Sequence, residues 1–195
     1  MEFITDLITE NNKLPAKTIT NFKNLLSFQN VKKKHVLTKA GETPTEFYIL
    51  KNGVVRSYFL DKKGREVIQS LTVGGASTGA FSSLILDKPS RIYYDCLTDC
   101  EFYVGDFKEF KKLAKKDIHI SLLYSRVLED AFIKKEKRIF ELSMLDATER
   151  YLKVRKDLPN IEKQIPQYQI ASFLNITPVQ LSRIRKDLLM KRVRK

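Results

Sequence analysis

Residues 48–67, "YILKNGVVRSYFLDKKGREV", carry the clearest structural pattern in the N-terminal half of the chain. Apolar, β-branched and aromatic residues form short runs here, and the runs stop at Asn52-Gly53 and at Asp61-Lys62-Lys63-Gly64. Both stops contain residues that tolerate a positive φ, so we expect a hairpin at each. Similar runs recur between Val31 and Val104 without a regular alternation of helices. This pattern predicts an antiparallel sandwich or barrel.

Helices are expected on both sides of this β-rich region. Residues 15–28, "PAKTITNFKNLLSF", carry apolar residues at helical spacing behind a proline suited to a first turn. After the strands, Asp106 can cap a helix whose third position is Glu109. A run without Gly or Pro then extends from Asp117 to about Leu142, which predicts a helical rod of roughly 40 Å.

The long helix has an apolar stripe that allows two interpretations. Ile120, Leu123, Val127 and Ala131 recur at a spacing of three to four residues. One interpretation is a core helix that lies on the β-structure. The length of the helix and its charged second half instead favour pairing with a second copy, which would make residues 117–142 the contact of a homodimer.

Positive charge is concentrated near the C-terminal end of the sequence. The 195 residues carry a formal net charge of +13 at pH 7, and residues 146–195 hold twelve Lys or Arg against five Asp or Glu. Such a density indicates a polyanionic partner, and double-stranded DNA is favoured over a membrane because no long apolar helix or lipidation signal is present. The first ten residues lack the features of a secretion signal, so we expect a cytoplasmic protein.

Residues 170–188, "IASFLNITPVQLSRIRKDL", have the spacing of a helix-turn-helix. Asn175 stands at the turn, where a residue that can adopt the left-handed conformation is needed. Thr177 is a good N-cap, Pro178 suits the first helical position, and Gln180 stands where a capping-box partner would. The residues expected to be buried where the two helices cross are Ile170, Ala171, Leu174, Ile176, Leu181 and Ile184.

The second helix of this motif would present polar and basic side chains to a major groove. The candidates for DNA contact are Thr177, Val179, Gln180, Ser182, Arg183, Arg185, Lys186, Lys191 and Arg192. Arg183 suits two hydrogen bonds to a guanine edge, and the other basic side chains suit phosphates. A capping role would withdraw Gln180 from the bases. The alternative is a solvated basic helix on an ordinary helical bundle.

The residues that usually carry catalysis or bind metals form no recognisable cluster in the sequence. Cys96 and Cys100 lack the second cysteine pair that a four-thiolate site needs, so we expect two small buried hydrophobic residues. His35 and His119 stand outside any ligand pattern, and no nucleophile motif is present. We therefore expect neither an enzyme nor a bound metal or other cofactor.

In its order of a β-rich domain, a long helix and a basic helix-turn-helix, the chain resembles the transcription regulators of the cyclic-AMP receptor protein and fumarate–nitrate regulator (Crp/Fnr) superfamily. The resemblance rests on residues 48–67, on the glycine-bearing stretch 74–91 and on residues 170–188. It implies a homodimer that binds an inverted-repeat operator, with RNA polymerase as a candidate further partner. An alternative function is a small-molecule receptor module that signals through protein contacts.

The resemblance also implies an α+β architecture with three parts. Residues 1–116 would form a β-roll like that of cyclic-nucleotide-binding domains, which is a jelly roll. Residues 117–145 would form the dimerisation helix and hinge. Residues 146–195 would form a helix-turn-helix domain, and the few residues after the recognition helix imply that its wing is short or missing.

The ligand cassette of the family is altered in this sequence. In nucleotide-binding members, a Gly-Glu pair binds the ribose, and an Arg ten residues after the Glu pairs with the cyclic phosphate. Here Gly79 is followed by Ala80, and Ser90 stands ten residues later. Arg91 is one residue late, which on a strand turns its side chain to the other face unless the loop around Pro89 adjusts. We therefore expect a degenerate cassette that does not bind cyclic AMP in the usual way, and the sequence does not identify an effector.

Overall fold

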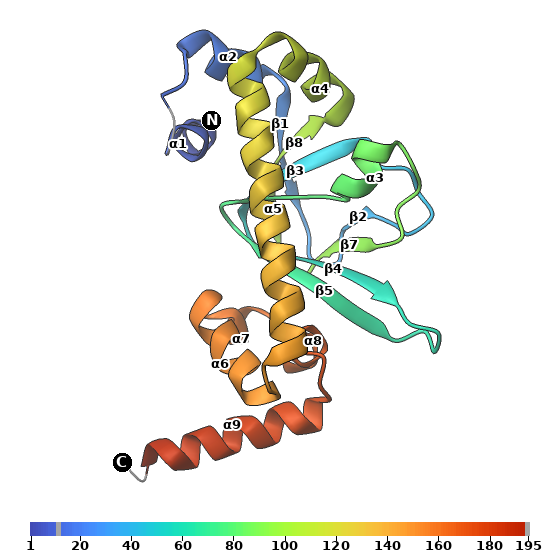
Figure 1. Cartoon of the computed structure of the whole chain (residues 1–195), viewed down its shortest axis with the longest axis vertical. Helices are drawn as coiled ribbons and strands as arrows, with labels where there is room; N and C mark the ends of the chain where they lie inside the picture. Colours follow the sequence, from blue (N-terminus) through green and yellow to red (C-terminus); the bar gives the residue numbers. More distant parts are fainter. Residues whose placement is uncertain (11–12, 194–195) are drawn as a thin grey trace.

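The computed structural model describes residues 1–10 and 13–193, and for residues 191–193 it describes the helical backbone alone. A β-roll occupies one side of the molecule, and a long helix runs along it to a group of C-terminal helices (Figure 1). In the described part of the chain, no helix is both long and apolar enough to cross a membrane.

In these residues, eight strands form two four-stranded antiparallel sheets. The first sheet has the order β1 (Leu26–Val31), β8 (Cys100–Asp106), β3 (Glu46–Asn52) and β6 (Ala76–Thr78). The second has the order β2 (Val36–Thr38), β7 (Tyr93–Cys96), β4 (Val54–Leu60) and β5 (Glu66–Val73). The expectation of an antiparallel two-sheet β-roll is confirmed.

Of the two expected hairpins, one is present and the other is a corner. Strands β4 and β5 form a hairpin around the turn at Asp61–Gly64. The turn at Asn52-Gly53 instead carries the chain from the first sheet to the second, so the prediction of a hairpin there was wrong. Gly53 has a φ of +104°, and a Cβ at this position would lie 2.5 Å from Sγ of Cys100. The corner therefore requires glycine.

The helices surround the β-roll on two sides. They are α1 (Glu2–Thr9), α2 (Ala16–Asn24), α3 (Phe81–Leu86), α4 (Phe107–Lys116), α5 (Ile118–Met144), α6 (Ala147–Asp157), α7 (Ile161–Gln164), α8 (Gln167–Phe173) and α9 (Pro178–Val193). The helix expected over residues 15–28 ends earlier, because Leu26 already opens strand β1. The predicted cap of α4 is confirmed, since the Asp106 carboxylate accepts a hydrogen bond from the Glu109 amide at 2.8 Å.

Three apolar cores hold the chain together. The first lies between the two sheets around Phe102, and the second lies between the outer face of the first sheet and helices α1, α2, α4 and α5, around Ile120. The third joins the second sheet, through Val54 and Leu97, to the C-terminal helices around Leu174. The C-terminal helices are thus packed directly on the β-roll.

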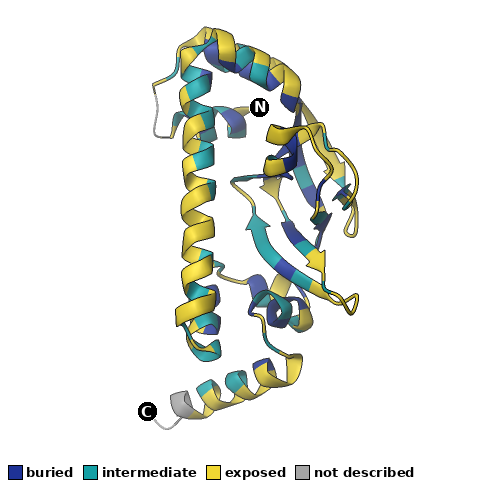
Figure 2. Cartoon of the chain, turned by 45° about the vertical axis from the view of Figure 1, so that its right-hand side comes forward, coloured by how far each residue is buried: buried dark blue, intermediate teal, exposed yellow. Residues whose placement is uncertain are grey.

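Helix α5 has two apolar faces with different surroundings. The stripe of Ile120, Leu123, Val127 and Ala131 faces the β-roll of its own chain, with Ile120 fully buried and the others partly buried. This stripe therefore belongs to the core, as the first of its two interpretations predicts. The outward side of the helix is largely exposed along its length (Figure 2). Large exposed apolar residues on α5 are Ile118, Leu122, Phe132, Ile133, Ile139, Phe140, Leu142 and Met144.

Candidate nucleic-acid interface and sensor cassette

Helices α8 and α9 form the predicted helix-turn-helix. Asn175, at the turn between them, has a φ of +55°, as its place in the motif requires. Ile170, Ala171, Leu174 and Leu181 are almost completely buried where the helices cross. Two further expected core residues, Ile176 and Ile184, are only partly buried.

The first turn of α9 is closed by a reciprocal cap. The Thr177 amide donates a hydrogen bond to Oε1 of Gln180 at 2.9 Å, and the Gln180 amide donates one to Oγ1 of Thr177 at 3.2 Å. The side chain of Gln180 is therefore used by its own helix, which is the capping role that withdraws it from the bases.

The exposed side of α9 carries most of the residues expected to contact DNA. Those exposed to solvent are Thr177, Val179, Gln180, Ser182, Arg183 and Lys186. Val179 is 61% exposed, although it is apolar, because the buried side of the helix is already occupied by Leu181. This side of α9 thus offers two cations, hydroxyl groups and one apolar side chain, which are the groups that contact base edges.

The remaining candidates on α9 are placed differently. The Arg185 guanidinium lies against Glu162 of α7, with 3.3 Å between Nε and Oε1, so its charge is partly neutralised inside the domain. Lys191 and Arg192 belong to the last turn of α9, where the side chains lie outside the described residues. The chain is helical through Val193, where the described residues end, so the expectation of a short or missing wing concerns residues outside the described part.

Two arginines hold the carboxyl end of α8. The Arg138 guanidinium of α5 donates a hydrogen bond to the carbonyl of Phe173 and lies over its ring, 4.1 Å from the centroid. Arg150 of α6 donates from Nε to the carbonyl of Leu174 at 3.1 Å. These carbonyls would otherwise be unpaired at the end of a helix. Arg138 therefore ties the long helix, and Arg150 ties α6, to the helix-turn-helix.

Arg56 links the β-roll to α8 through a buried polar cluster. Its guanidinium pairs with the Asp95 carboxylate through bonds of 2.7 Å and 2.9 Å, with the Glu66 carboxylate, and with Oε1 of Gln169 at 2.9 Å. Burial disfavours the charged guanidinium, but the two carboxylates outweigh this effect and raise the pKa of Arg56. The sequence gives no local signal for this cluster.

A second polar contact joins α8 to the edge strand β5. The hydroxyl of Ser172 donates a hydrogen bond to the Glu66 carbonyl at 2.9 Å and accepts one from the Ile68 amide at 3.2 Å. An edge strand has unpaired backbone groups, and here Ser172 pairs two of them. Helix α8 is thus fixed to the β-roll by polar bonds as well as by the third core.

The cassette residues lie on both sides of α3, with Gly79 and Ala80 before the helix and Ser90 and Arg91 after it. Ser90 is 4% exposed, and its hydroxyl bonds both to the carbonyl and to the amide of Ile92. Ala80 is buried immediately before α3, and Gly79 has a φ of +138°. Arg91 is exposed to solvent. The buried cassette positions therefore present a methyl group and a hydroxyl that already has backbone partners.

The two cysteines lie in the core between the sheets. Cys96 and Cys100 are 1% and 3% exposed and are not joined in a disulfide. The neighbouring Cys100 thiol and, after it, burial raise the pKa of the Cys96 thiol, which keeps it protonated. The expectation that both are small buried residues is confirmed. Among the described residues, no group of His, Cys, Asp and Glu is arranged to hold a metal ion.

Comparison with known proteins supports the sequence resemblance. Residues 28–117 match the family model described as the cyclic nucleotide-binding domain. No curated protein matches the sequence of the chain. Among solved structures, FixK2 from Bradyrhizobium japonicum superposes with a TM-score of 0.73, at 18% identity and over 85% of each chain.

Two further structures have the same overall fold. The c-di-GMP responsive global regulator CLP from Xanthomonas campestris has a TM-score of 0.72 and 16% identity, over 91% of this chain and 93% of that one. A protein from Eubacterium rectale, described as a transcriptional regulator of the crp/fnr family, has a TM-score of 0.71 and 16% identity, over 91% of this chain and 85% of that one. Residues 28–117 thus match the model of the cyclic nucleotide-binding domain, and the chain as a whole has the fold of these three solved structures.

Proposed function

We propose that the chain is a transcription regulator that binds an inverted-repeat DNA operator as a homodimer. The observation that carries this proposal is the exposed side of α9, where Val179, Ser182, Arg183 and Lys186 stand on a capped helix that is packed firmly from behind. A helix presented in this way fits a major groove, and two copies related by a two-fold axis would read two half-sites about one helical turn apart.

The three parts of the chain have separate roles in this proposal. Residues 1–116 form the sensor domain, residues 117–145 the dimerisation helix and hinge, and residues 146–195 the DNA-binding domain. RNA polymerase is the further partner that such a regulator would contact at a promoter.

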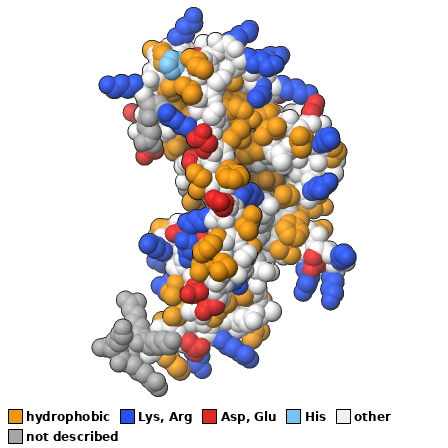
Figure 3. Space-filling model, viewed as in Figure 1, with side chains coloured by type: hydrophobic (Ala, Val, Ile, Leu, Met, Phe, Trp, Pro, Cys, Tyr) orange, Lys and Arg blue, Asp and Glu red, His pale blue; other side chains and the backbone are white. Residues whose placement is uncertain are grey.

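The outward face of α5 supports the homodimer. Phe132 and Ile139, and likewise Ile133 and Phe140, are seven residues apart, which is the repeat of helices that pair side by side. Orange side chains lie along the exposed length of this helix in Figure 3. Exposed apolar surface of this extent marks a contact with another molecule. A second α5 has the matching length and pattern.

The dimer contact is tested by Phe132→Asp combined with Phe140→Asp. We expect wild-type protein to sediment as a dimer and the double variant as a monomer, because two carboxylates would be buried without partners in the seam. Ile85→Asp is the matched control, since Ile85 is 50% exposed on α3 and does not belong to the outward face of α5. A double variant that remains dimeric would place the contact elsewhere.

DNA binding is tested by selecting duplexes from a random pool with the purified protein. We expect the selected duplexes to share an inverted repeat and their affinity to fall steeply as salt increases, because Lys and Arg side chains displace counterions from phosphates. Absence of binding to any duplex at low salt would overturn the proposal.

The β-roll, in this proposal, does not bind cyclic AMP in the usual way. The support is the placement of Ala80 and Ser90, which leaves the buried cassette without a carboxylate for the ribose and without a guanidinium for the phosphate. Calorimetry with cyclic AMP and cyclic GMP is expected to show no saturable binding. Tight binding that Arg91→Gln abolishes would mean that the loop around Pro89 does bring Arg91 into the site.

A further inference from the structure

We propose that the chain has a ligand site outside the cassette, in an aromatic cavity between α5, α1 and the outer face of the first sheet. The geometry points to a small organic anion with a flat apolar body as its ligand. The cavity has a volume of about 350 Å³ and lies on the opposite side of the first sheet from the core between the sheets.

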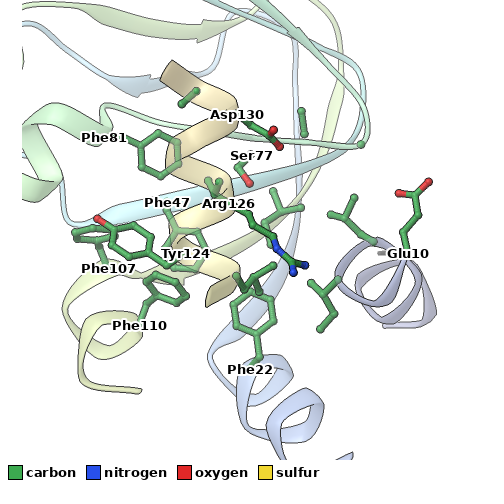
Figure 4. A pocket seen from close by; sticks show the side chains of 18 of the residues that line it. Glu10, Phe22, Phe47, Ser77, Phe81, Phe107, Phe110, Tyr124, Arg126 and Asp130 are labelled. Atoms are coloured by element: carbon green, nitrogen blue, oxygen red, sulfur yellow. The ribbon is translucent and has the colours of Figure 1, made fainter. Parts of the chain in front are cut away.

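The walls of this cavity are mostly aromatic. The rings that line it are Phe22, Phe47, Phe81, Phe107, Phe110 and Tyr124. They come from α2, β3, α3, α4 and α5, and Figure 4 shows the rings from these elements gathered around one space. Rings in this arrangement favour a flat apolar group, which can pack against ring faces and edges.

Arg126 supplies the charge that the ligand has to match. In Figure 4 its side chain reaches from α5 across the cavity toward Phe22, whereas Glu10 and Asp130 lie at the margins. Arg126 is exposed to solvent and forms no hydrogen bond or ion pair with any residue that the structure describes. A guanidinium beside apolar walls binds a carboxylate or sulfonate with two parallel hydrogen bonds. The site therefore fits an anion better than a neutral or cationic molecule.

The size of the cavity limits the ligand further. Small-molecule sites have volumes of about 300–1,000 Å³, so this one is at the lower end of the range. Small aromatic acids fit such a space. The site is also distinct from the cassette, because Arg91 and Ser90 are not among the residues that line it.

The position of the cavity links its occupant to the helix-turn-helix. Phe81 follows the cassette residue Ala80 directly, and Val127 and Ala131 belong to α5, whose Arg138 holds the end of α8. A bound ligand would fix α5 against the β-roll and thereby favour one position of α8. This regulatory consequence rests on the proposed function, whereas ligand binding itself does not.

The test uses 1-anilinonaphthalene-8-sulfonate, a fluorescent probe with two aromatic groups and one sulfonate, on the full chain without DNA. We expect saturable binding of one probe per chain. Arg126→Gln should weaken binding at least tenfold. Arg126→Lys should weaken it less, because the positive charge remains although the two parallel hydrogen bonds are lost. Ala131→Phe should abolish it by filling the cavity. Arg91→Gln is the matched control and should bind as the wild type does.

The possible outcomes separate this proposal from its alternatives. Equal probe binding by the wild type, Arg126→Gln and Ala131→Phe would overturn it, as would a loss confined to Arg91→Gln. Absence of probe binding by the wild type, together with a changed sedimentation coefficient of Arg126→Gln, would mean that a second copy of the chain covers the cavity, and this also overturns the proposal. Circular dichroism of each variant shows whether it is folded. Because no DNA is present, a failure of the proposed operator binding does not affect the result.

Discussion

Nη1 of Arg56, in strand β4, donates a hydrogen bond of 2.9 Å to Oε1 of Gln169, in the first turn of α8. Both residues are buried, and the same guanidinium also pairs with Asp95 inside the β-roll. One charged group thus satisfies a carboxylate of the β-roll and an amide of the helix-turn-helix. The β-roll and the helix-turn-helix cannot separate without exposing the Arg56 guanidinium or breaking its hydrogen bond to Gln169.

Loss of the Arg56 side chain should be strongly destabilising. We expect Arg56→Ala to lower the free energy of unfolding by about 3–5 kcal/mol, because the buried Asp95 carboxylate then has no cation partner. Urea unfolding measures this change. The control is Arg65→Ala, since Arg65 is an exposed arginine paired with Asp61 and should cost about 0–1 kcal/mol. If the two variants lost similar amounts of unfolding free energy, the buried cluster would have no special role in stability.

Gln169→Leu should weaken the contact between the domains and leave the β-roll itself intact. The substitution keeps the Arg56–Asp95 pair but removes the acceptor on α8, at a cost of about 1–3 kcal/mol. We therefore expect faster amide hydrogen exchange in α8 and α9, with unchanged exchange in β7. Faster exchange throughout both domains would instead indicate a general loss of stability.

Arg183 and Lys186 should have different effects on DNA binding, although both are exposed on α9. If Arg183 contacts a guanine edge, Arg183→Ala costs about 1–3 kcal/mol and relaxes specificity at one base pair. Lys186→Ala should weaken binding to all sequences alike and reduce the salt dependence. Binding assays on the selected operator and its single-base variants measure both effects. Indistinguishable profiles would contradict these assignments, and Arg192→Ala is expected to behave as Lys186→Ala does.

Substitutions of Gln180 and Val179 should also have different effects, because only the Gln180 side chain caps its own helix. Gln180→Ala removes the acceptor of the Thr177 amide and should lower stability by about 0.5–2 kcal/mol without altering base preference. Val179→Ala should leave stability nearly unchanged and alter the preference at one base pair, where the side chain meets a thymine methyl. A change of base preference in Gln180→Ala would show that the cap opens on DNA.

Asp117 should contribute to the loss of stability in acid. Burial disfavours its carboxylate, but hydrogen bonds from the Thr18 hydroxyl at 2.7 Å and the His119 amide at 3.0 Å outweigh this and lower the pKa of Asp117. The stabilisation is therefore fully present above the unfolded pKa of about 4 and is lost as pH falls through the lower folded pKa. Urea unfolding should show that, between about pH 5 and pH 2, the free energy of unfolding declines less for Asp117→Asn than for the wild type. Asp187→Asn, at an exposed position on α9, is the control.

The features that could be predicted from the sequence are those specified by neighbouring residues. The turn at Asn175 needs a residue that accepts positive φ, and the cap of α9 needs Thr177 and Gln180 three positions apart. Such requirements are local, so a short stretch of sequence contains all the information. The altered cassette register is of the same kind, since Ser90 and Arg91 differ by one position in sequence.

The features that could not be predicted depend on residues that are far apart in sequence. Arg56 is 39 residues from Asp95 and 113 residues from Gln169, and no local pattern indicates that the three meet. Asn52-Gly53 has the same turn chemistry in a hairpin as in a corner between sheets, and only the strand order distinguishes the two. The inner stripe of α5 likewise has the spacing of a dimer seam, and its burial against the β-roll follows from tertiary packing.

The outward face of α5 has a consequence for how the proposed regulator responds to its own abundance. An apolar face that is exposed in one chain is buried only when two chains meet, so assembly is governed by mass action. At concentrations below the dissociation constant of the dimer, occupancy of a two-fold operator then rises with the square of the chain concentration. The number of copies in the cell thereby becomes an input signal in its own right.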